Sequence, residues 1–214
     1  DFSGYVAYDT ELAEVKKYKA ERLDIKNIDG LIKKLHDNNI YAIARITVFQ
    51  DPFYSKKYPE SSVKTKSGAI WKDRKGLSYI DPSARDYWDY MVLLSRASEK
   101  VGFDELNYDY IRFPSDGNMS DAVFSLSGNR AKADVLDSFF SYLRGELKNG
   151  KDPISIPMSA DVFGMTTTNT DDLGIGQVLE RIDKHFDYIS PMVYPSHYPP
   201  TFHGYKNPAE HPYE

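Results

Sequence analysis

The chain has 214 residues, 41% of them hydrophobic and 28% charged, which fits one folded domain and excludes wholesale disorder. Its 27 basic and 32 acidic residues give a net charge of -5, which argues against a general nucleic-acid binder because phosphate contacts need a basic face. The absence of cysteine excludes disulfides, thiolate metal sites and cysteine nucleophiles. No apolar stretch approaches the roughly 18 residues of a membrane span, and no signal peptide is recognisable.

The apolar pattern predicts helices and strands in alternation. A helix over 27–38 precedes a buried strand over 40–49 and a long loop over 50–80. A long helix then begins at Asp81-Pro82-Ser83 and ends at Gly102. The remaining predicted elements are a strand over 103–114, a helix over 131–148, a strand over 154–164, a helix over 177–185 and a strand over 188–194.

Four strands, each separated from the next by a helix, predict an α/β fold of the (β/α)8 TIM-barrel type. Eight βα units need about 250 residues, so four clear units indicate an incomplete barrel that occupies residues 1–214 as a single domain. An open doubly wound sheet is the alternative, but such a sheet usually carries a glycine-rich loop after its first strand. The nearest candidate, Gly174-Ile175-Gly176, follows no predicted strand and lacks a third glycine, so we interpret it as a helix start.

The strand over 103–114 carries polar residues where a buried strand is usually apolar. Because side chains alternate along a strand, Glu105, Asn107, Asp109 and Ile111 are expected to share one face. Burying such polar groups is costly unless they serve a ligand or one another. Active sites of parallel barrels lie at the carboxyl ends of the strands, which favours Asp109. An edge strand facing water and a salt bridge from Asp109 to an arginine on a neighbouring strand are the alternatives.

The strand over 154–164 supplies a second acid, Asp161, on the same parity as Ser159. Asp109 and Asp161 would then project from adjacent strands at one rim. Glycoside hydrolysis uses such a pair, with one carboxyl protonated to donate to the leaving oxygen and the other ionised to attack or to activate water. We therefore predict Asp109 as nucleophile or base and Asp161 as general acid. Capping of the following turn is the alternative role for Asp161.

Six further residues are candidates for substrate binding. Arg45 can pair with the ionised carboxylate, and Arg112 is a second candidate for that role. Trp71, in the long loop, can stack on a sugar ring or, alternatively, anchor the loop to the barrel. The candidates that offer hydrogen-bonding groups, with packing as their alternative role, are Asn107, Tyr194 and His197. The five histidines show no paired ligand spacing, so we predict no metal and no other cofactor.

Motifs spread over nearly the whole chain are Ile43–Ile46, Trp71–Gly76, Phe103–Glu105, Asp109–Pro114, Ser159–Gly164, Gly174–Gln177 and Ile189–Tyr198. In these motifs the chain resembles a bacterial family of glycosyl hydrolase domains within the TIM-barrel glycosidases. The resemblance implies glycosidase activity, and it implies barrel strands before Asp1 and after Glu214. The strand with Asn107 and Asp109 is also similar to that of α-amylase-type enzymes, which implies a nucleophile at Asp109. In a chitinase-type motif the catalytic glutamate would fall at Ile111, which cannot donate a proton.

Together these features predict a glycoside hydrolase that acts on a poly- or oligosaccharide, has no nucleic-acid partner and is secreted or associated with the cell envelope. Two other classes of function stay open. A non-catalytic carbohydrate-binding barrel would bind glycan at the same rim without turnover. A scaffold of the cell envelope would hold Asp109 and Asp161 in internal salt bridges and have no open cleft.

Overall fold

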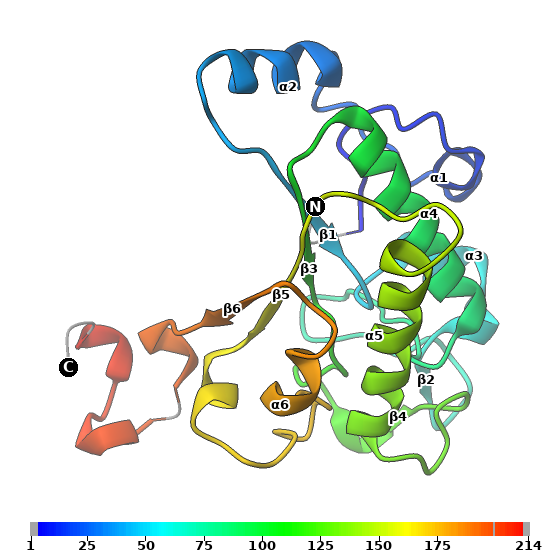
Figure 1. Cartoon of the computed structure of the whole chain (residues 1–214). Coiled ribbons are helices and arrows are strands. Elements are labelled where there is room, and N and C mark those ends of the chain that lie inside the picture. The colour runs from blue at the N-terminus through cyan, green and yellow to red at the C-terminus, as the bar shows by residue number, and fades with distance from the viewer. Residues whose placement is uncertain (1–3, 199, 212–214) are drawn as a thin grey trace.

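The computed structural model describes residues 4–198 and 200–211, and within them four parallel strands form one sheet in the order β1-β3-β5-β6. These strands are β1 (Ile43–Thr47), β3 (Glu105–Asp109), β5 (Met158–Phe163) and β6 (Tyr188–Met192). Figure 1 shows them side by side, with the long helices gathered against one face. The predicted α/β fold with a parallel sheet is confirmed, and the sheet does not close into a barrel within the described residues.

The four predicted helices form and alternate with the strands. They are α2 (Ile28–Asp37), α4 (Arg85–Val101), α5 (Lys132–Lys148) and α6 (Leu179–Ile182). The Asn27 side chain caps α2 by accepting a hydrogen bond from the Gly30 amide at 2.8 Å. Gly102 ends α4 with φ of 103°, and a Cβ there would lie 3.3 Å from Ile32 of α2. A glycine therefore allows α4 to end in contact with α2.

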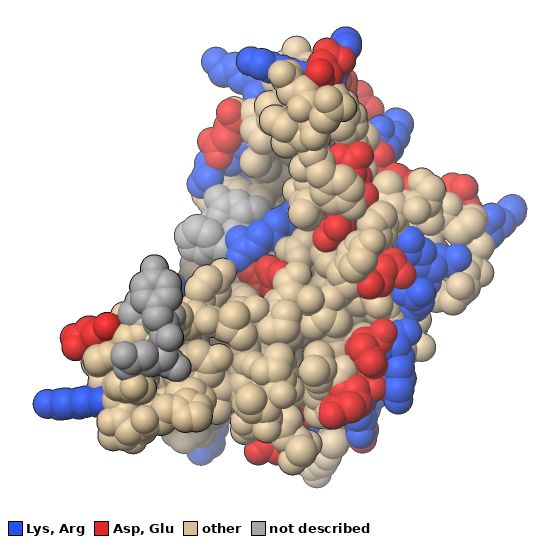
Figure 2. All heavy atoms as spheres, turned by 60° about the vertical axis from the view of Figure 1, so that its left-hand side comes forward, with Lys and Arg blue, Asp and Glu red and all other residues tan. Residues whose placement is uncertain are grey.

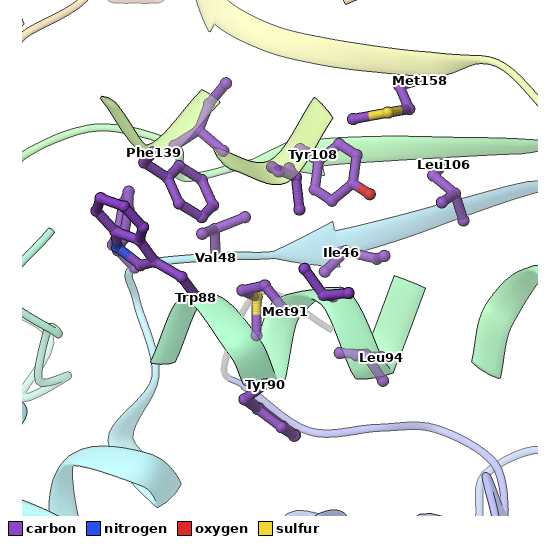
Figure 3. Packing of buried hydrophobic residues seen from close by; sticks show 14 of the residues in the cluster. Ile46, Val48, Trp88, Tyr90, Met91, Leu94, Leu106, Tyr108, Phe139 and Met158 are labelled. Atoms are coloured by element: carbon purple, nitrogen blue, oxygen red, sulfur yellow. The ribbon is translucent and has the colours of Figure 1, made fainter. Parts of the chain in front are cut away.

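The helix-facing side of the sheet forms the core. Ile46, Leu106, Tyr108 and Met158 are buried against α4 and α5, as Figure 3 shows. The helices contribute large side chains to the same cluster, among them Trp88, Met91, Leu94 and Phe139. Because alternate strand residues point to opposite faces, burying this apolar set directs the intervening polar set to the opposite, inner face.

The strand register aligns the carboxyl ends of the sheet. Arg45 of β1 is the register partner of Asn107 of β3, and Thr47 is the partner of Asp109. Asn107 is in turn paired with Ser159 of β5. The inner-face residues of three strands are therefore level with one another. Figure 2, which turns this side of the molecule forward, shows basic and acidic atoms together in the middle of a largely uncharged surface.

The predicted strands are too long at their ends. β3 stops at Asp109 because Tyr110 has φ of 54°, in the left-handed region that no strand continues. Ile111 consequently leaves the face that it was predicted to share with Asp109 and is buried in the core. Similarly, residues 154–157 lie before β5, and α6 covers only a part of the predicted helix over 177–185.

The segment 50–80, predicted as a loop, contains short elements of its own. These are α3 (Pro52–Lys57), the 3-10 helix η1 (Pro59–Ser61) and β2 (Lys64–Thr65). β2 pairs with β4 (Ala122–Val123) of the segment that follows β3. Too few residues take part for a periodic signal, so tertiary contacts define this small sheet. The other short elements are α1 (Ala13–Tyr18), η2 (Met119–Asp121), η3 (Gly164–Thr167), η4 (Pro195–His197), η5 (Phe202–Gly204) and η6 (Pro208–Glu210).

None of the helices in the described part of the chain has the length and apolar character needed to cross a bilayer.

Truncation of Phe139 tests the core between α4, α5 and the sheet. Phe139 is fully buried, with ring centroids 4.9 Å from Phe49 and 5.5 Å from Trp88. We expect Phe139→Ala to lower the free energy of unfolding by about 3–5 kcal/mol, because it removes buried apolar area and leaves a cavity. Urea denaturation followed by circular dichroism measures the change. The exposed Leu126 provides the control, since Leu126→Ala should change stability by less than about 0.5 kcal/mol. Equal effects of the two substitutions would contradict this assignment of the core.

Candidate active site

Three charged side chains from three neighbouring strands meet on the inner face of the sheet. The Arg45 guanidinium of β1 pairs through Nη2 with Oδ2 of Asp109 on β3. Its Nε lies 3.7 Å from Oδ2 of Asp161 on β5. The side chains of Asp109 and Asp161 are 5% and 16% exposed, whereas that of Arg45 is 49% exposed. Arg45 is therefore the part of the cluster that solvent reaches most easily.

Asp109 is fixed by the backbone that ends its strand. The Tyr110 amide donates a hydrogen bond of 2.6 Å to Asp109 Oδ1, so both carboxylate oxygens have a partner. Tyr110 adopts a left-handed conformation, which for a non-glycine residue costs about 1–3 kcal/mol. The turn after β3 therefore holds the carboxylate at the expense of some backbone strain, as is common where a side chain must be positioned for function.

A hydrogen-bonded chain of polar side chains runs from the amino end of the sheet to Asp161. The Tyr41 hydroxyl donates to Glu105 Oε2 at 3.1 Å, and the Ser159 hydroxyl donates to Glu105 Oε1. Asn107 Nδ2 donates to Ser159 Oγ and to Asp161 Oδ1, at 3.0 Å in each case. The predicted shared face of Glu105 and Asn107 is thereby confirmed, and the buried polar groups serve one another.

The direction of these bonds determines on which oxygen of Asp161 a proton would lie. Ser159 uses its only hydrogen on Glu105, so its oxygen must accept from Asn107. The amide nitrogen of Asn107 is thus oriented toward Asp161, and Oδ1 of Asp161 is an acceptor. A proton on Asp161 therefore belongs on Oδ2.

Burial raises the pKa of Asp161 above its ordinary value. The negative charge of Asp109 acts in the same direction, while the hydrogen bond from Asn107 and the charge of Arg45 oppose the increase. Asp161 is not a helix cap, because the following 3-10 helix begins after Phe163 and has no side-chain cap. A partly buried carboxyl with a raised pKa can hold a proton and donate it to a bound group.

Two other sequence-predicted residues, Arg112 and Trp71, form their contacts outside this cluster. Arg112 is buried and donates to the Phe113 carbonyl at 3.0 Å and to Ser115 Oγ at 3.1 Å, with its guanidinium over the Phe163 ring. The prediction that Arg112 pairs with a catalytic carboxylate is therefore wrong, since β3 ends before it and the chain turns into the interior.

Trp71 is 2% exposed, and its indole donates to the Asn118 carbonyl at 2.9 Å. The prediction that it stacks on a sugar is wrong for this structure because its faces are covered, and the alternative role of anchoring the loop is the one observed. Tyr194 follows β6 and is 55% exposed. The backbone of His197 ends η4, but the side chain lies outside the described part of the structure, so its predicted role stays a prediction.

Sequence reasoning missed Asp51, the N-cap of α3. Its Oδ1 accepts hydrogen bonds of 2.9 Å from the amides of Phe53 and Tyr54, and its Oδ2 accepts one of 3.1 Å from the Tyr87 hydroxyl. Burial raises the pKa of Asp51 to about 6, against the effect of these bonds. Asp51 also borders a cavity of about 250 Å³ along β1 that Arg45 lines but neither Asp109 nor Asp161 does. The dipeptide Asp51-Pro52, a capping residue before proline at the first helical position, was the available signal.

Within the described ranges, no group of three or more His, Asp or Glu side chains is arranged to hold a metal ion.

The fold is similar to that of solved structures. Aspergillus fumigatus Ega3, solved in complex with galactosamine, is similar with a TM-score of 0.50 over 87% of this chain and 62% of its own, at 13% sequence identity. This similarity concerns the fold, an incomplete version of the TIM-barrel type. The chain spans less than two thirds of the Ega3 chain.

The family follows from the sequence match. The chain belongs to the family described as "Putative glycosyl hydrolase domain", whose model matches residues 1–214. A hypothetical protein from Ruminiclostridium thermocellum ATCC 27405 is 32% identical, with a TM-score of 0.67 over 82% of this chain and 80% of that one. No curated protein sequence gives a significant match.

Removing the Ser159 hydroxyl tests the hydrogen-bond direction. In Ser159→Ala, the Asn107 amide loses the hydroxyl oxygen that accepts its hydrogen bond and fixes its orientation. The carbonyl oxygen of Asn107 can then turn toward Asp161 and accept a hydrogen bond from the protonated carboxyl. We expect the pKa of Asp161 to rise further, as measured by carbon-13 NMR titration of the side-chain carboxyls. Ser155→Ala, which removes a hydroxyl bonded to Glu99 instead, is the control and should leave the titration of Asp161 unchanged. An unchanged or lower pKa of Asp161 in Ser159→Ala would show that Ser159 does not orient the amide.

Asp51 makes stability depend on pH in a defined window. The folded chain keeps this proton up to about pH 6, whereas the unfolded chain loses it near pH 3.8. The free energy of unfolding should therefore fall by about 3 kcal/mol as the pH rises through this window. Asp51→Asn keeps an acceptor for the cap and cannot ionise, so this part of the slope should disappear. Urea denaturation between pH 4 and pH 7 measures it, with the exposed Asp152→Asn as the control that retains the slope. A slope in Asp51→Asn equal to that of the wild type would contradict the prediction.

Proposed function

We propose that this chain is the catalytic part of a glycoside hydrolase that cleaves O-glycosidic bonds of a poly- or oligosaccharide with two carboxyl groups. The observation that carries the proposal is the pair of Asp109 and Asp161, held by adjacent strands on either side of one guanidinium. Membership in a family described by glycosyl hydrolase activity supports it.

The two acids have different environments, which supports different roles. Asp161 is the general acid in this proposal, because a raised pKa keeps its proton available for the leaving oxygen. Asp109 is the nucleophile or the base, because Arg45 offsets its charge and the Tyr110 amide fixes its orientation. Arg45 is half exposed, so a substrate hydroxyl can take its place over the acids when the side chain moves outward. Asn107 keeps Asp161 oriented throughout.

Isosteric substitution of each acid tests the assignment. We expect Asp109→Asn to lower kcat/KM at least about 10³-fold, because the attacking or activating carboxylate is lost. Asp161→Asn should lower kcat/KM by about 10²–10⁴-fold on glycosides with a poor leaving group. Aryl glycosides whose leaving groups need no protonation should restore most of the activity to Asp161→Asn but not to Asp109→Asn.

Release of reducing ends from a panel of polysaccharides provides the measurement. The control is Asp152→Asn, which removes one negative charge, as the two test substitutions do, but from a side chain that is 97% exposed. This variant should retain full activity. Full activity of Asp109→Asn on a substrate that the wild type hydrolyses would exclude the proposed mechanism.

The ion pairs of Arg45 with both acids favour one second candidate, a carbohydrate-binding barrel without turnover. In that case the wild type binds a glycan of the panel and releases no reducing ends from it. The variant Asp161→Asn binds the same glycan as tightly as the wild type.

A further inference from the structure

A second concave surface lies away from the paired acids. It is a groove of about 740 Å³ between the end of α1, one side of α3 and the segment 70–78. Figure 1 shows α1 and α3 on the same side of the molecule. The groove residues are Lys17, Tyr18, Lys19, Pro52, Phe53, Lys56, Lys57, Ile70, Lys72, Gly76 and Ser78.

The charge of this groove has one sign. Five exposed lysines line the groove, and Tyr18 is its other ionisable residue. No Asp or Glu lines it, although the whole chain carries a net charge of -5. None of the five lysines forms an ion pair with a carboxylate of the described residues. A concave surface with charges of one sign attracts ions of the opposite sign, because its low-dielectric walls concentrate the field. An anion in the groove would also relieve the repulsion among the lysines.

The lysines are presented by firmly packed elements. Lys56 and Lys57 lie three and four residues after Phe53, so the three side chains share one face of α3. Tyr18, at the end of α1, packs edge-on against Tyr54 of α3 at 5.1 Å and joins the two walls.

The third wall and the rim add further positive charge. Lys72 lies on a β-bridge with Ser78, which closes the turn within the 70–78 segment. Lys19 has φ of 56° at the end of α1, and this sharp turn directs the chain away from the helix. The five charges are therefore distributed over three walls rather than along one flexible segment.

The lining of the groove indicates the chemistry of its ligand. Tyr18, Phe53 and Ile70 are partly exposed apolar surfaces between the lysines, suited to the apolar face of a sugar ring. No arginine lines the groove, whereas arginine is the usual residue for bidentate contacts with phosphates and bases. The volume lies within the range of about 300–1,000 Å³ of typical ligand sites. We propose that this groove binds an acidic oligosaccharide, with the lysines on its carboxylates and the rings against its sugar faces.

Two walls of the groove belong to the segment of chain that follows β1. α3 and the 70–78 segment belong to the connection that leaves the carboxyl end of β1, the end at which Asp109 and Asp161 lie. The inference rests on the proposed function for the glycan nature of the ligand, and it adds the substrate class, an anionic polysaccharide.

Binding to defined oligomers tests the groove without requiring turnover. Isothermal titration calorimetry at 50 mM salt would use hexagalacturonate and hexamannuronate as acidic probes, cellohexaose as the neutral probe and a dT12 oligonucleotide as the nucleic-acid probe. We expect the wild type to bind at least one acidic probe more tightly than the other two, with an affinity that falls as salt rises. The triple variant Lys56→Gln, Lys57→Gln, Lys72→Gln should lose about tenfold or more of that affinity.

The matched control is Lys34→Gln, Lys151→Gln, Lys184→Gln, which removes three exposed lysines outside the groove. It should bind within about twofold of the wild type, and circular dichroism would establish that both triple variants are folded. Asp161→Asn should bind like the wild type, so loss of hydrolysis and loss of groove binding are separate results. Failure of both acidic probes to bind, equal binding by the two triple variants, or tighter binding of dT12 would each overturn the inference.

Discussion

The Arg45 guanidinium between Asp109 and Asp161 is the interaction on which the inner face of the sheet depends. Two carboxylates brought close on a partly buried surface repel each other, and a cation between them offsets that repulsion. The arrangement requires β1, β3 and β5 to be parallel and in register, because only then do residues from three separate segments reach the same level of the sheet. Both acids are largely buried, whereas the guanidinium that pairs with them is half exposed.

The acids differ although they share this cation. Asp109 is fixed by the amide of the strained residue that follows it, while Asp161 is fixed by a polar chain that begins at Glu105. The direction of hydrogen bonding in that chain orients the Asn107 amide toward Oδ1 of Asp161, so that a proton on this carboxyl belongs on Oδ2. Such a fully connected network specifies one arrangement of buried polar groups, because an unpaired member would be costly. The environment of Asp109 thus depends on the residue that follows it, and that of Asp161 depends on side chains of the neighbouring strands.

The two faces of the sheet differ in the side chains that they carry: one is apolar and stabilises the fold, and the other is polar. One face is fixed by apolar contacts with α4 and α5, which hold the strands in place. The other face and the connections after the strands are free to carry polar groups. The long connection after β1 has both kinds of side chain. Trp71 and Tyr79 form a small apolar cluster within it, and its lysines line an open groove. This internal packing explains how such a connection presents charges in a fixed arrangement.

The sequence by itself determined the order of helices and strands, the parallel sheet and the face shared by Glu105, Asn107 and Asp109, because these follow from local periodicity. It also indicated that Asp109, Asp161 and Arg45 belong together, since equal parity at the ends of neighbouring parallel strands leaves few other arrangements. Only the tertiary structure decided that Trp71 and Arg112 are buried, because burial depends on how the connections after β1 and β3 pack on each other. The β2–β4 pairing, the hydrogen-bond direction toward Asp161 and the lysine groove likewise depend on contacts between residues far apart in the chain, which no local pattern encodes.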